Sequence, residues 1–415
     1  MKTLKIVADE NIPGLHHYFD RGLRPLSEKG QFSDIEIQAL PGRDIGPSHL
    51  IGAQMLLVRS ITQVSAELIS AGELAFVGSC TIGTDHLDLE LLDRLGVRWA
   101  NAPGCNANAV AEYVLQQVMA FAAESKKSVS DLRIGVVGYG NVGRKVVEKM
   151  RCFDVRAVLI NDPPLFETQR EEPWCSTSGS CIDGVSPVDL ETLFSCDIVT
   201  IHTPLVRSGR HPTYHLIGPE LLARMPAASV LINTARGPVI DLQACLTWRA
   251  NLSSPERATR RWVFDVFEGE PHVNPKWFEH LSCVTPHIAG HSQIGKEQGT
   301  RQVWLAALDH FGLLIPSEFP SSSQLPQLDL LLRHADLSCQ DWSDLLEAVS
   351  GLSCTDAYFR GAMDNVPQQK WAKVFEVTRK GYKPRLELSQ VRLAAPQLSI
   401  DARNRLQSLG VTVDQ

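Results

Sequence analysis

Residues 134–143 read IGVVGYGNVG, and this stretch decides the fold. An apolar run typical of a buried β-strand leads directly into the pattern G-x-G-x-x-G, whose glycines are Gly138, Gly140 and Gly143, and a helical pattern follows. The first glycine permits a tight turn, the second lets the backbone approach a pyrophosphate, and the third lets helix and strand pack closely. The stretch therefore predicts a βαβ unit that binds a dinucleotide.

Two features next to this turn favour NAD as the cofactor. Asn141 and Val142 are the first residues of the predicted helix. Its N-terminal N–H groups and its dipole therefore face the pyrophosphate. Asp162 ends the following strand, where a carboxylate accepts hydrogen bonds from the ribose hydroxyls and repels the 2′-phosphate of NADP. The alternative is a glycine-rich turn in another kind of α/β protein, with Asp162 acting only as a cap before Pro163.

Strand patterns alternate with helical patterns on both sides of this stretch, which predicts two Rossmann-like, doubly wound parallel sheets. The predicted strands of the first sheet are Lys5–Ala8, Met55–Arg59 and Ala75–Ser79. Those of the second are Arg133–Val137, Ala157–Asn161, Ile198–His202, Val230–Asn233, Trp262–Asp265 and Cys283–Pro286. We expect the helix Asn108–Ala123 to bridge the two domains and the helix Gly295–Phe311 to return to the first.

This organisation predicts three domains. Residues 1–107 with 288–314 form a substrate domain, residues 108–287 form the NAD-binding domain, and residues 321–415 form a small C-terminal α/β domain. A Pro- and Ser-rich linker, Ile315–Gln327, precedes the third domain, and Glu171–Gly184 reads as a surface loop.

The C-terminal domain is expected to mediate a homodimer. Helices are predicted at Trp342–Val349 and Lys370–Arg379, and a strand at Arg385–Leu388. These helices carry large apolar residues, including Trp342, Leu345, Trp371 and Phe375, more than so short a segment easily buries alone. A two-fold interface would cover them. A monomeric domain or a regulatory ligand-binding domain is the alternative.

Composition narrows the class of protein. The net charge of -7 argues against nucleic acid as a partner, because phosphate binding needs a basic face. The N-terminus reads as a strand and not as a signal peptide, and no apolar run approaches the ~20 residues of a membrane span. The ten cysteines include no C-x-x-C pair, which fits unpaired thiols in a reducing cytoplasm and no metal site.

Three further segments, each at the end of a predicted strand, offer a guanidinium, a carboxylate and an imidazole: Arg236, Glu270 and His287. Oxidation of a 2-hydroxy acid needs this set. The imidazole takes the hydroxyl proton as hydride leaves the same carbon, and the carboxylate holds the ring and stabilises its protonated form. The guanidinium binds the substrate carboxylate through two parallel hydrogen bonds.

Each of these residues alone has a plainer interpretation. Arg236 could form a surface ion pair, Glu270 could be an exposed turn residue, and His287 could be a hydrogen-bonded buried histidine. His287 also forms an H-x-x-x-H pair with His291, but on a glycine-containing loop and without the glutamate of a zinc-protease helix. The set is favoured because all three lie at strand ends of one dinucleotide domain.

The segments GYGNVG, NTARGPVID, DVFEGEP and TPHIAGHS, with GTDHLDLELLDRLGVRWANAPG in the first domain, resemble the D-2-hydroxyacid dehydrogenase family. The resemblance extends from Lys5 to Gly312. It implies Arg236 as substrate anchor, His287 as acid and base with Glu270 as its partner, and Asp265 as a contact of the nicotinamide carboxamide. It further implies that the cofactor contacts Thr203, Thr234, Ala235, the backbone of Arg236, and Gly290.

Finer motifs, among them VADENIPG and APGCNANAVAEYV, resemble one branch of that family, which acts on a phosphorylated 2-hydroxy acid in vitamin B6 synthesis and carries a C-terminal dimerisation domain. The resemblance implies that Ser60 and Thr81 contact the substrate. Arg59 is a candidate for the phosphate or, equally, a salt-bridged residue at a strand end. His291 stands where this branch is expected to have tyrosine, so the outer substrate contact differs. Alternatives are another branch, such as phosphoglycerate dehydrogenase, and a non-enzymatic NAD-sensing scaffold.

Overall fold

The computed structural model describes residues 2–23, 32–169, 185–313, 328–331 and 334–414. The chain divides into two compact units. Unit 1 comprises residues 1–106 and 292–326, and unit 2 comprises residues 107–291 and 327–415. The loop predicted at Glu171–Gly184 and the linker predicted at Ile315–Gln327 lie outside the described residues.

Unit 1 contains a parallel five-stranded sheet of order β2-β1-β3-β4-β5. Its strands are β1 (Lys2–Asp9), β2 (Phe32–Leu40), β3 (Met55–Val58), β4 (Phe76–Ser79) and β5 (Arg98–Ala100). Its helices are η1 (His16–Arg21), η2 (Pro47–Leu50), α2 (Ala66–Ile69), α3 (Leu89–Arg94) and α11 (Gln293–His310). The strand order reverses between β1 and β3, and in open α/β sheets ligands bind at such a switch point.

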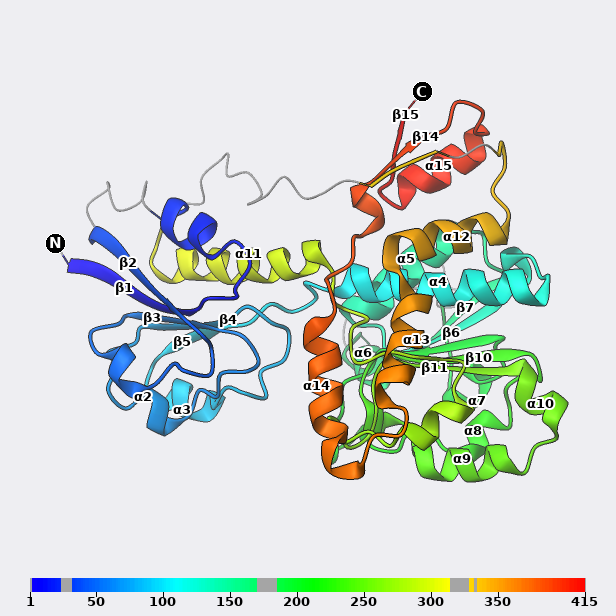
Figure 1. Cartoon of the computed structure of the whole chain (residues 1–415), viewed down its shortest axis with the longest axis horizontal. Coiled ribbons are helices and arrows are strands. Elements are labelled where there is room, and N and C mark those ends of the chain that lie inside the picture. Colours follow the sequence, from blue (N-terminus) through cyan, green and yellow to red (C-terminus); the bar gives the residue numbers. More distant parts are fainter. Residues whose placement is uncertain (1, 24–31, 170–184, 314–327, 332–333, 415) are drawn as a thin grey trace. The chain divides into compact units, whose positions relative to one another are not determined.

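Helix α11 lies against this sheet although nearly 200 residues separate it from β5 (Figure 1). Val303 and Trp304 of α11 are buried in the same core as the sheet residues. A Cβ on Gly78 of β4 would lie only 2.3 Å from Val303 Cγ1, so glycine is needed for the helix to approach this closely.

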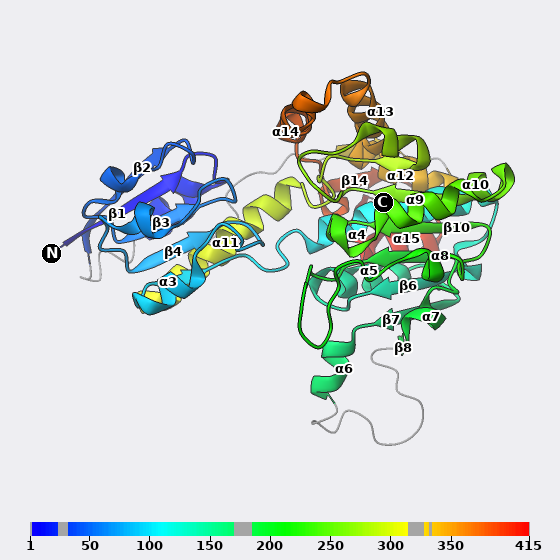
Figure 2. The same ribbon diagram turned by 90° about the horizontal axis from the view of Figure 1, so that it is seen from below.

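Unit 2 contains a parallel seven-stranded sheet of order β12-β11-β10-β9-β6-β7-β8. Figure 2 labels β10, β6, β7 and β8 of this sheet. The strands are β6 (Arg133–Val137), β7 (Ala157–Asn161), β8 (Ser186–Pro187), β9 (Ile198–Ile201), β10 (Ser229–Asn233), β11 (Arg260–Phe264) and β12 (Cys283–Val284). This is the classical dinucleotide-binding order extended by one strand, with its switch point between β6 and β9.

Helix α4 (Ala107–Ser125) precedes the first of these strands. The helices between the strands are α5 (Asn141–Arg151), α6 (Pro163–Gln169), α7 (Leu190–Leu193), α8 (Pro219–Leu222), α9 (Leu242–Ala250) and α10 (Ser254–Thr259). Short 3₁₀ segments are η3 (Val129–Asp131), η4 (Gly237–Val239) and η5 (Pro275–His280). The six strands predicted from the sequence of this region are all present, within two residues at each end. The α/β class with two parallel sheets is therefore confirmed.

The C-terminal segment belongs to unit 2 and adds a small parallel sheet of order β13-β14-β15. Its elements are β13 (Leu328–Leu331), α12 (Cys339–Ser350), α13 (Leu352–Met363), η6 (Gln368–Lys370), α14 (Trp371–Gly381), η7 (Leu388–Gln390), β14 (Val391–Ala394), α15 (Ile400–Ser408) and β15 (Thr412–Asp414). Helix α12 lies along α4 (Figure 1), and Trp342 packs edge-on against Phe153 with ring centroids 4.9 Å apart.

The large apolar residues that were expected to need a dimer interface are covered by the chain itself. Trp342 and Leu345 share a core with α4 and α5, and Trp371 is partly buried in the other core of the unit. Phe375 packs against Phe359, which in turn contacts Phe278. The burial of these residues within one chain therefore removes this particular argument for a dimer.

The strand predicted at Arg385–Leu388 is wrong, because the strand of this region is β14, which begins at Val391, three residues after the predicted strand ends. The backbone N–H of Arg385 donates to the carbonyl oxygen of His291, and Arg385 and Glu387 are buried through polar contacts. Alternating apolar residues in this stretch therefore do not mark a sheet strand. Among the described residues, none of the helices is both long and apolar enough to cross a bilayer.

Candidate active site

The glycine turn after β6 has the geometry that its motif predicts. Gly138 has φ +91°, and a Cβ there would lie 2.8 Å from the carbonyl carbon of His202. A Cβ on Gly143 would lie 2.1 Å from the carbonyl oxygen of Gly138. A Cβ on Gly140 would meet no atom within 4 Å. Two of the glycines are thus required by the protein's own packing, whereas the third leaves space open at the start of α5.

Asp162, after β7, accepts two backbone hydrogen bonds. The N–H of Tyr139 donates to Oδ2 at 2.7 Å, and the N–H of Leu165 donates to Oδ1 at 3.0 Å. The second bond caps helix α6, as the alternative interpretation of Asp162 proposed. The first bond ties the carboxylate to the glycine turn, so the capping role and a position beside the dinucleotide site are compatible.

The other side of the switch point is formed by His202 and Thr203, which follow β9, and by Thr234, which follows β10. His202 Nε2 lies 2.9 Å from Thr200 Oγ1, and Nδ1 lies 3.5 Å from Thr234 Oγ1. Burial lowers the pKa of His202 to about 3, so the ring is neutral at physiological pH. This histidine supports the turn and does not supply charge to a ligand.

Arg236 is held on the loop after β10 by its neighbours' backbone. The buried Asn233 side chain accepts from the N–H of Ala235 at 3.1 Å and donates to the carbonyl oxygen of Arg236 at 3.1 Å. A Cβ on Gly237 would lie 1.9 Å from the carbonyl carbon of Phe267, so glycine allows this loop to touch the next. The guanidinium itself is exposed, with Nη1 donating to the Ala235 carbonyl oxygen at 2.8 Å.

His287 and Glu270 form a hydrogen-bonded pair. Nδ1 of His287 lies 2.8 Å from Oε2 of Glu270, while Oε1 of Glu270 accepts from the N–H of Phe267 at 2.6 Å. Because an ionised carboxylate can only accept, Nδ1 carries the proton and Nε2 is the nitrogen that can take up another. The His287 side chain is 34% exposed and can therefore reach a small molecule.

Asp265 organises the loop that carries His287. Its carboxylate is 1% exposed and accepts from the N–H groups of Ile288 at 2.7 Å and Ala289 at 2.9 Å, and from Thr285 Oγ1 at 2.6 Å. The phenol of Tyr113, on α4, lies 3.0 Å from the same Thr285 hydroxyl and donates to it. Burial raises the pKa of Asp265. This carboxylate faces the loop backbone, which is a role that the sequence did not predict.

In unit 1 the residues expected to contact substrate follow two neighbouring strands, with Arg59 and Ser60 after β3, at the switch point, and Thr81 after β4. Arg59 Nε donates to Asp9 Oδ2 at 2.9 Å, and Nη2 donates to Oδ1 at 3.3 Å. Asp9 ends β1 and is fully buried, whereas Arg59 follows β3 and is 30% exposed. Ser60 is exposed at the same edge, and Thr81, after β4, lies 2.8 Å from Ser79 Oγ. The salt bridge is thus present, and any contact of Arg59 with a phosphate is in addition to it.

His291 and Gly290 end the loop of His287 in unit 2. The N–H of His291 donates to the Ile288 carbonyl oxygen at 2.8 Å, and its ring lies 6.3 Å from that of Tyr382, centroid to centroid. Within the described residues no three His, Cys, Asp or Glu side chains gather in a way that could hold a metal ion.

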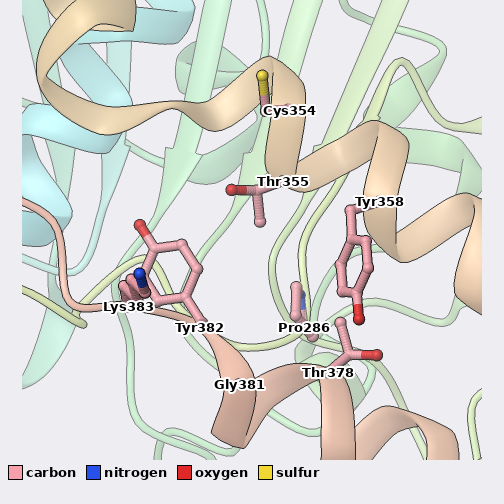
Figure 3. A pocket seen from close by; sticks show the side chains of 8 residues that line it. All are labelled: Pro286, Cys354, Thr355, Tyr358, Thr378, Gly381, Tyr382 and Lys383. Atoms are coloured by element: carbon pink, nitrogen blue, oxygen red, sulfur yellow. The ribbon is translucent and has the colours of Figure 1, made fainter.

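A cavity of about 320 Å³ lies on the other side of this loop, between α13 and the end of α14 (Figure 3). Its lining includes Pro286, the residue before His287, together with Thr355 and Tyr358 of α13 and Tyr382 beyond α14. None of the residues predicted for catalysis or cofactor binding lines it. The candidate active site is therefore the edge of the sheet at the strand ends and not this cavity.

The residues of unit 2 fit a bound dinucleotide. The open space at Gly140 and the N-terminus of the 11-residue helix α5 suit a pyrophosphate, and Asp162 lies where a ribose is expected. When bound, NAD would accept a hydride from the substrate.

Comparison with known proteins identifies the class of protein to which this fold belongs. Residues 106–289 match the family described as D-isomer specific 2-hydroxyacid dehydrogenase, NAD binding domain. Among solved structures, the chain is similar to a NAD⁺-bound 3-phosphoglycerate dehydrogenase of Entamoeba histolytica, with 22% identity, a TM-score of 0.55, and coverage of 75% of this chain and 96% of that one. A D-lactate dehydrogenase of Treponema pallidum is similar at 20% identity and a TM-score of 0.55, covering 75% and 98%. At such identity these likenesses show the fold alone.

Curated relatives narrow the class further. Erythronate-4-phosphate dehydrogenase of Azotobacter vinelandii is 38% identical over 98% of this chain and 99% of its own length. The enzyme of the same name from Chromohalobacter salexigens is 36% identical over 99% of both chains. The chain carries the NAD-binding domain of the D-2-hydroxyacid dehydrogenases. It belongs to the erythronate-4-phosphate dehydrogenase family.

Some residues of the site were not predicted from the sequence. Asp9 and Tyr113 depend on neighbours far along the chain, and no local pattern marks them. Gly237 could have been found, because a glycine directly after Arg236 in a predicted site loop suggests close backbone approach.

Proposed function

We propose that the chain oxidises the C2 hydroxyl of 4-phospho-D-erythronate to 2-oxo-3-hydroxy-4-phosphobutanoate with NAD, a step of pyridoxal 5′-phosphate (vitamin B6) synthesis. The observation that carries the chemistry is the pair of His287 and Glu270, with Nε2 of the imidazole able to accept a proton. The similarity to erythronate-4-phosphate dehydrogenases over almost the whole chain supports the choice of substrate.

Three side chains of unit 2 have separate roles in the proposed reaction. His287 Nε2 removes the hydroxyl proton, and the Glu270 carboxylate stabilises the imidazolium that forms. Arg236 binds the substrate carboxylate, which is a role suited to an exposed guanidinium at a strand end. In the reverse direction the imidazolium returns the proton to the carbonyl oxygen.

The glycine turn and its neighbours hold the cofactor. Gly138, Gly140 and Gly143 with the start of α5 (Asn141, Val142) receive the pyrophosphate, and Asp162 receives a ribose. Further contacts come from Thr203, Thr234, Ala235, Asp265 and Gly290. The carboxylate of Asp265 already accepts three hydrogen bonds from its own loop, so its contribution to the cofactor includes the shape of that loop.

Unit 1 supplies the contacts to the rest of the substrate. Arg59 and Ser60 lie at the switch point and Thr81 after the neighbouring strand β4, and Arg59 brings a cation that a phosphate dianion requires. The Asp9 salt bridge holds Arg59 by Nε and Nη2, so Nη1 is the nitrogen that we assign to the phosphate. His291 replaces the tyrosine expected after HIAG, and we assign one of its ring nitrogens to donate a hydrogen bond to the substrate.

The experiment is a substrate panel with purified protein and NAD, in which NADH formation is followed by absorbance at about 340 nm. We expect 4-phosphoerythronate to give the highest kcat/KM. A faster reaction of 3-phosphoglycerate would replace this assignment by phosphoglycerate dehydrogenase activity. NAD binding without turnover of either acid would favour a non-enzymatic NAD-sensing scaffold.

We also propose that the protein is a cytoplasmic homodimer. Tyr358 on α13 and Val377 on α14 are 64% and 58% exposed, and large apolar side chains on adjacent helices suit a two-fold interface. Light scattering of the full chain should give the mass of two protomers, and Tyr358→Asp with Val377→Asp should reduce it to one. A monomeric wild-type chain would contradict the proposal.

A further inference from the structure

The loop of His287 (residues 285–291, here the His287 loop) is contacted by an arginine from the far end of the chain. Arg385 lies in the segment between α14 and η7, about 100 residues after His287. Its Nη1 donates to the carbonyl oxygen of Ile288 at 3.3 Å, and its Nη2 donates to that of Ala289 at 2.7 Å. Nη2 also donates to the carbonyl oxygen of Ala109 on α4, and the Arg385 N–H donates to that of His291 at 3.1 Å.

The same two residues of the loop are held from the opposite direction by Asp265. The N–H groups of Ile288 and Ala289 donate to the Asp265 carboxylate, while their carbonyl oxygens accept from the Arg385 guanidinium. Both charged groups are buried, Asp265 at 1% and Arg385 at 6% exposed. Every hydrogen-bonding backbone group of this dipeptide is therefore attached to a buried charged side chain, and such bonds are stronger than neutral ones.

The loop needs such support because of the backbone conformation of His287. Its φ is +57°, in the left-handed region that costs an ordinary residue about 1–2 kcal/mol. A conformation of this kind persists only where the surroundings over-determine it. The conformation directs the ring so that Nδ1 reaches Glu270 at 2.8 Å. Relaxation of the loop would break that contact.

Arg385 is itself anchored in a buried charged cluster on α4 and α5. Glu112 of α4 and Lys149 of α5 are joined at 3.4 Å, and the N–H of Leu388 donates to Glu112 at 3.1 Å. Burial raises the pKa of Glu112 to about 7, against the opposing effects of Lys149 and Arg385. The segment that carries Arg385 is thus fastened to α4 just after the arginine, through Glu387 and Leu388.

We propose that Arg385 is a positioning residue of the reaction, which holds His287 in the orientation needed for proton transfer by fixing the carbonyl oxygens of the two residues that follow it. The inference rests on the proposed acid and base role of His287. It gives the C-terminal segment a part in catalysis, although no residue of the proposed reaction lies in it. The segment therefore contributes to the geometry of the active site as well as to the hydrophobic cores of unit 2.

The test compares Arg385→Lys with Arg403→Lys in the full chain. Lysine keeps the buried charge but cannot contact three carbonyl oxygens through a planar fork. We expect Arg385→Lys to lower kcat about 10- to 100-fold, which is typical of a reacting group displaced by about 1 Å. The NAD Kd should change less than about twofold, because the glycine turn is untouched. Arg403 also donates to two carbonyl oxygens, Asp414 and Ala395, but away from the loop, so its variant should keep kcat within about twofold.

A double-mutant cycle distinguishes positioning from general loss of structure. In the His287→Ala background, Arg385→Lys should cause almost no further loss of turnover, since the group that it positions is already absent. A purely structural role would lower the residual rate by the same factor in both backgrounds. An equal factor would overturn the proposal.

Hydrogen exchange provides a readout that does not depend on the substrate. The amides of Ile288 and Ala289 should be protected in the wild type to the degree of sheet amides, and Arg385→Lys should speed their exchange at least about tenfold without affecting β6. Rapid exchange in the wild type would overturn the inference even if no variant folded. If the wild type turned over no substrate, the proposed function would be refuted instead. The hydrogen-exchange result would still show whether Arg385 restrains the His287 loop.

Discussion

Each unit places its candidate binding groups where the strand order of its sheet reverses, but the two switch points are built differently. In unit 2 the turn after β6 is made of backbone, and Gly138 and Gly143 allow contacts that a Cβ would block. In unit 1 the switch point is occupied by side chains, with Arg59 bound to the buried Asp9. A pyrophosphate is suited to backbone N–H groups, whereas a small phosphorylated acid needs a cation.

The comparison also distinguishes the residues assigned to proton transfer from those assigned to the phosphate. Unit 2 holds the only residues that we assign to proton transfer, and unit 1 holds those that we assign to the substrate's phosphate. Mutations of His287 and Glu270 should therefore change mainly kcat, while a mutation of Arg59 should change mainly KM.

The largest effect is expected for His287→Ala. Loss of the general base should lower kcat by about 10²–10⁴, with NAD affinity nearly unchanged, because the cofactor phosphates are bound at the glycine turn. Steady-state rates and NAD titration by fluorescence measure the two quantities. Glu270→Gln is the matched control, and it should keep the ring hydrogen-bonded but lose part of the rate. Near-normal turnover of His287→Ala would remove this residue from the mechanism.

The next effect is expected for Arg59→Met in unit 1. Removing a charged hydrogen bond to phosphate costs about 1.5–3 kcal/mol, which corresponds to an increase in KM of about 10- to 100-fold, with a smaller change in kcat. Arg59→Lys should recover part of the loss. If KM stays constant while the melting temperature falls, Arg59 serves only its salt bridge with Asp9.

A smaller effect, on the free energy of unfolding, should distinguish Gly143 from Gly140 in the unit 2 turn. Gly143→Ala places a Cβ against the backbone of Gly138 and should lower the free energy of unfolding by about 1–3 kcal/mol. Gly140→Ala meets no protein atom and should leave the melting temperature unchanged while weakening NAD binding. Thermal melts with and without NAD compare the two variants. Equal destabilisation would mean that Gly140 also has a packing role.

The smallest effect concerns cofactor choice. Wild-type protein should prefer NAD, and Asp162→Ala should narrow the gap to NADP by about tenfold, since it removes a charge that repels the 2′-phosphate. Because Asp162 also caps α6, Asp162→Asn is the better control for stability. Equal affinity of the wild type for both cofactors would contradict the role given to Asp162.

The local parts of the site could be predicted because they follow from short stretches of chain. Gly138 to Gly143 encode a backbone conformation, and Glu270 and His287 both follow predicted strands of one parallel sheet, so their meeting at one edge was expected. The pairing of Asp9 with Arg59 depends on β1 lying beside β3, 50 residues away, and no local signal announces it.

The C-terminal segment shows the opposite case. The helices α12 and α14 were predicted from their patterns, whereas α13 and α15 were not. The packing of α12 against α4 and the place of Arg385 at the His287 loop were not predicted either. An apolar helix face shows only that something covers it, and the covering surface here belongs to the same chain.

The sequence by itself determined the class of fold, the dinucleotide turn and the family, and it supplied Arg236, Glu270 and His287 as candidates for the reaction, because each depends on residue types at short, fixed spacings. Only the tertiary structure decided what restrains these groups. Buried charges such as Asp265 and Arg385 act through backbone atoms of residues that the fold brings near them. Every residue type has these backbone groups, so the residues that are held cannot be recognised from the sequence.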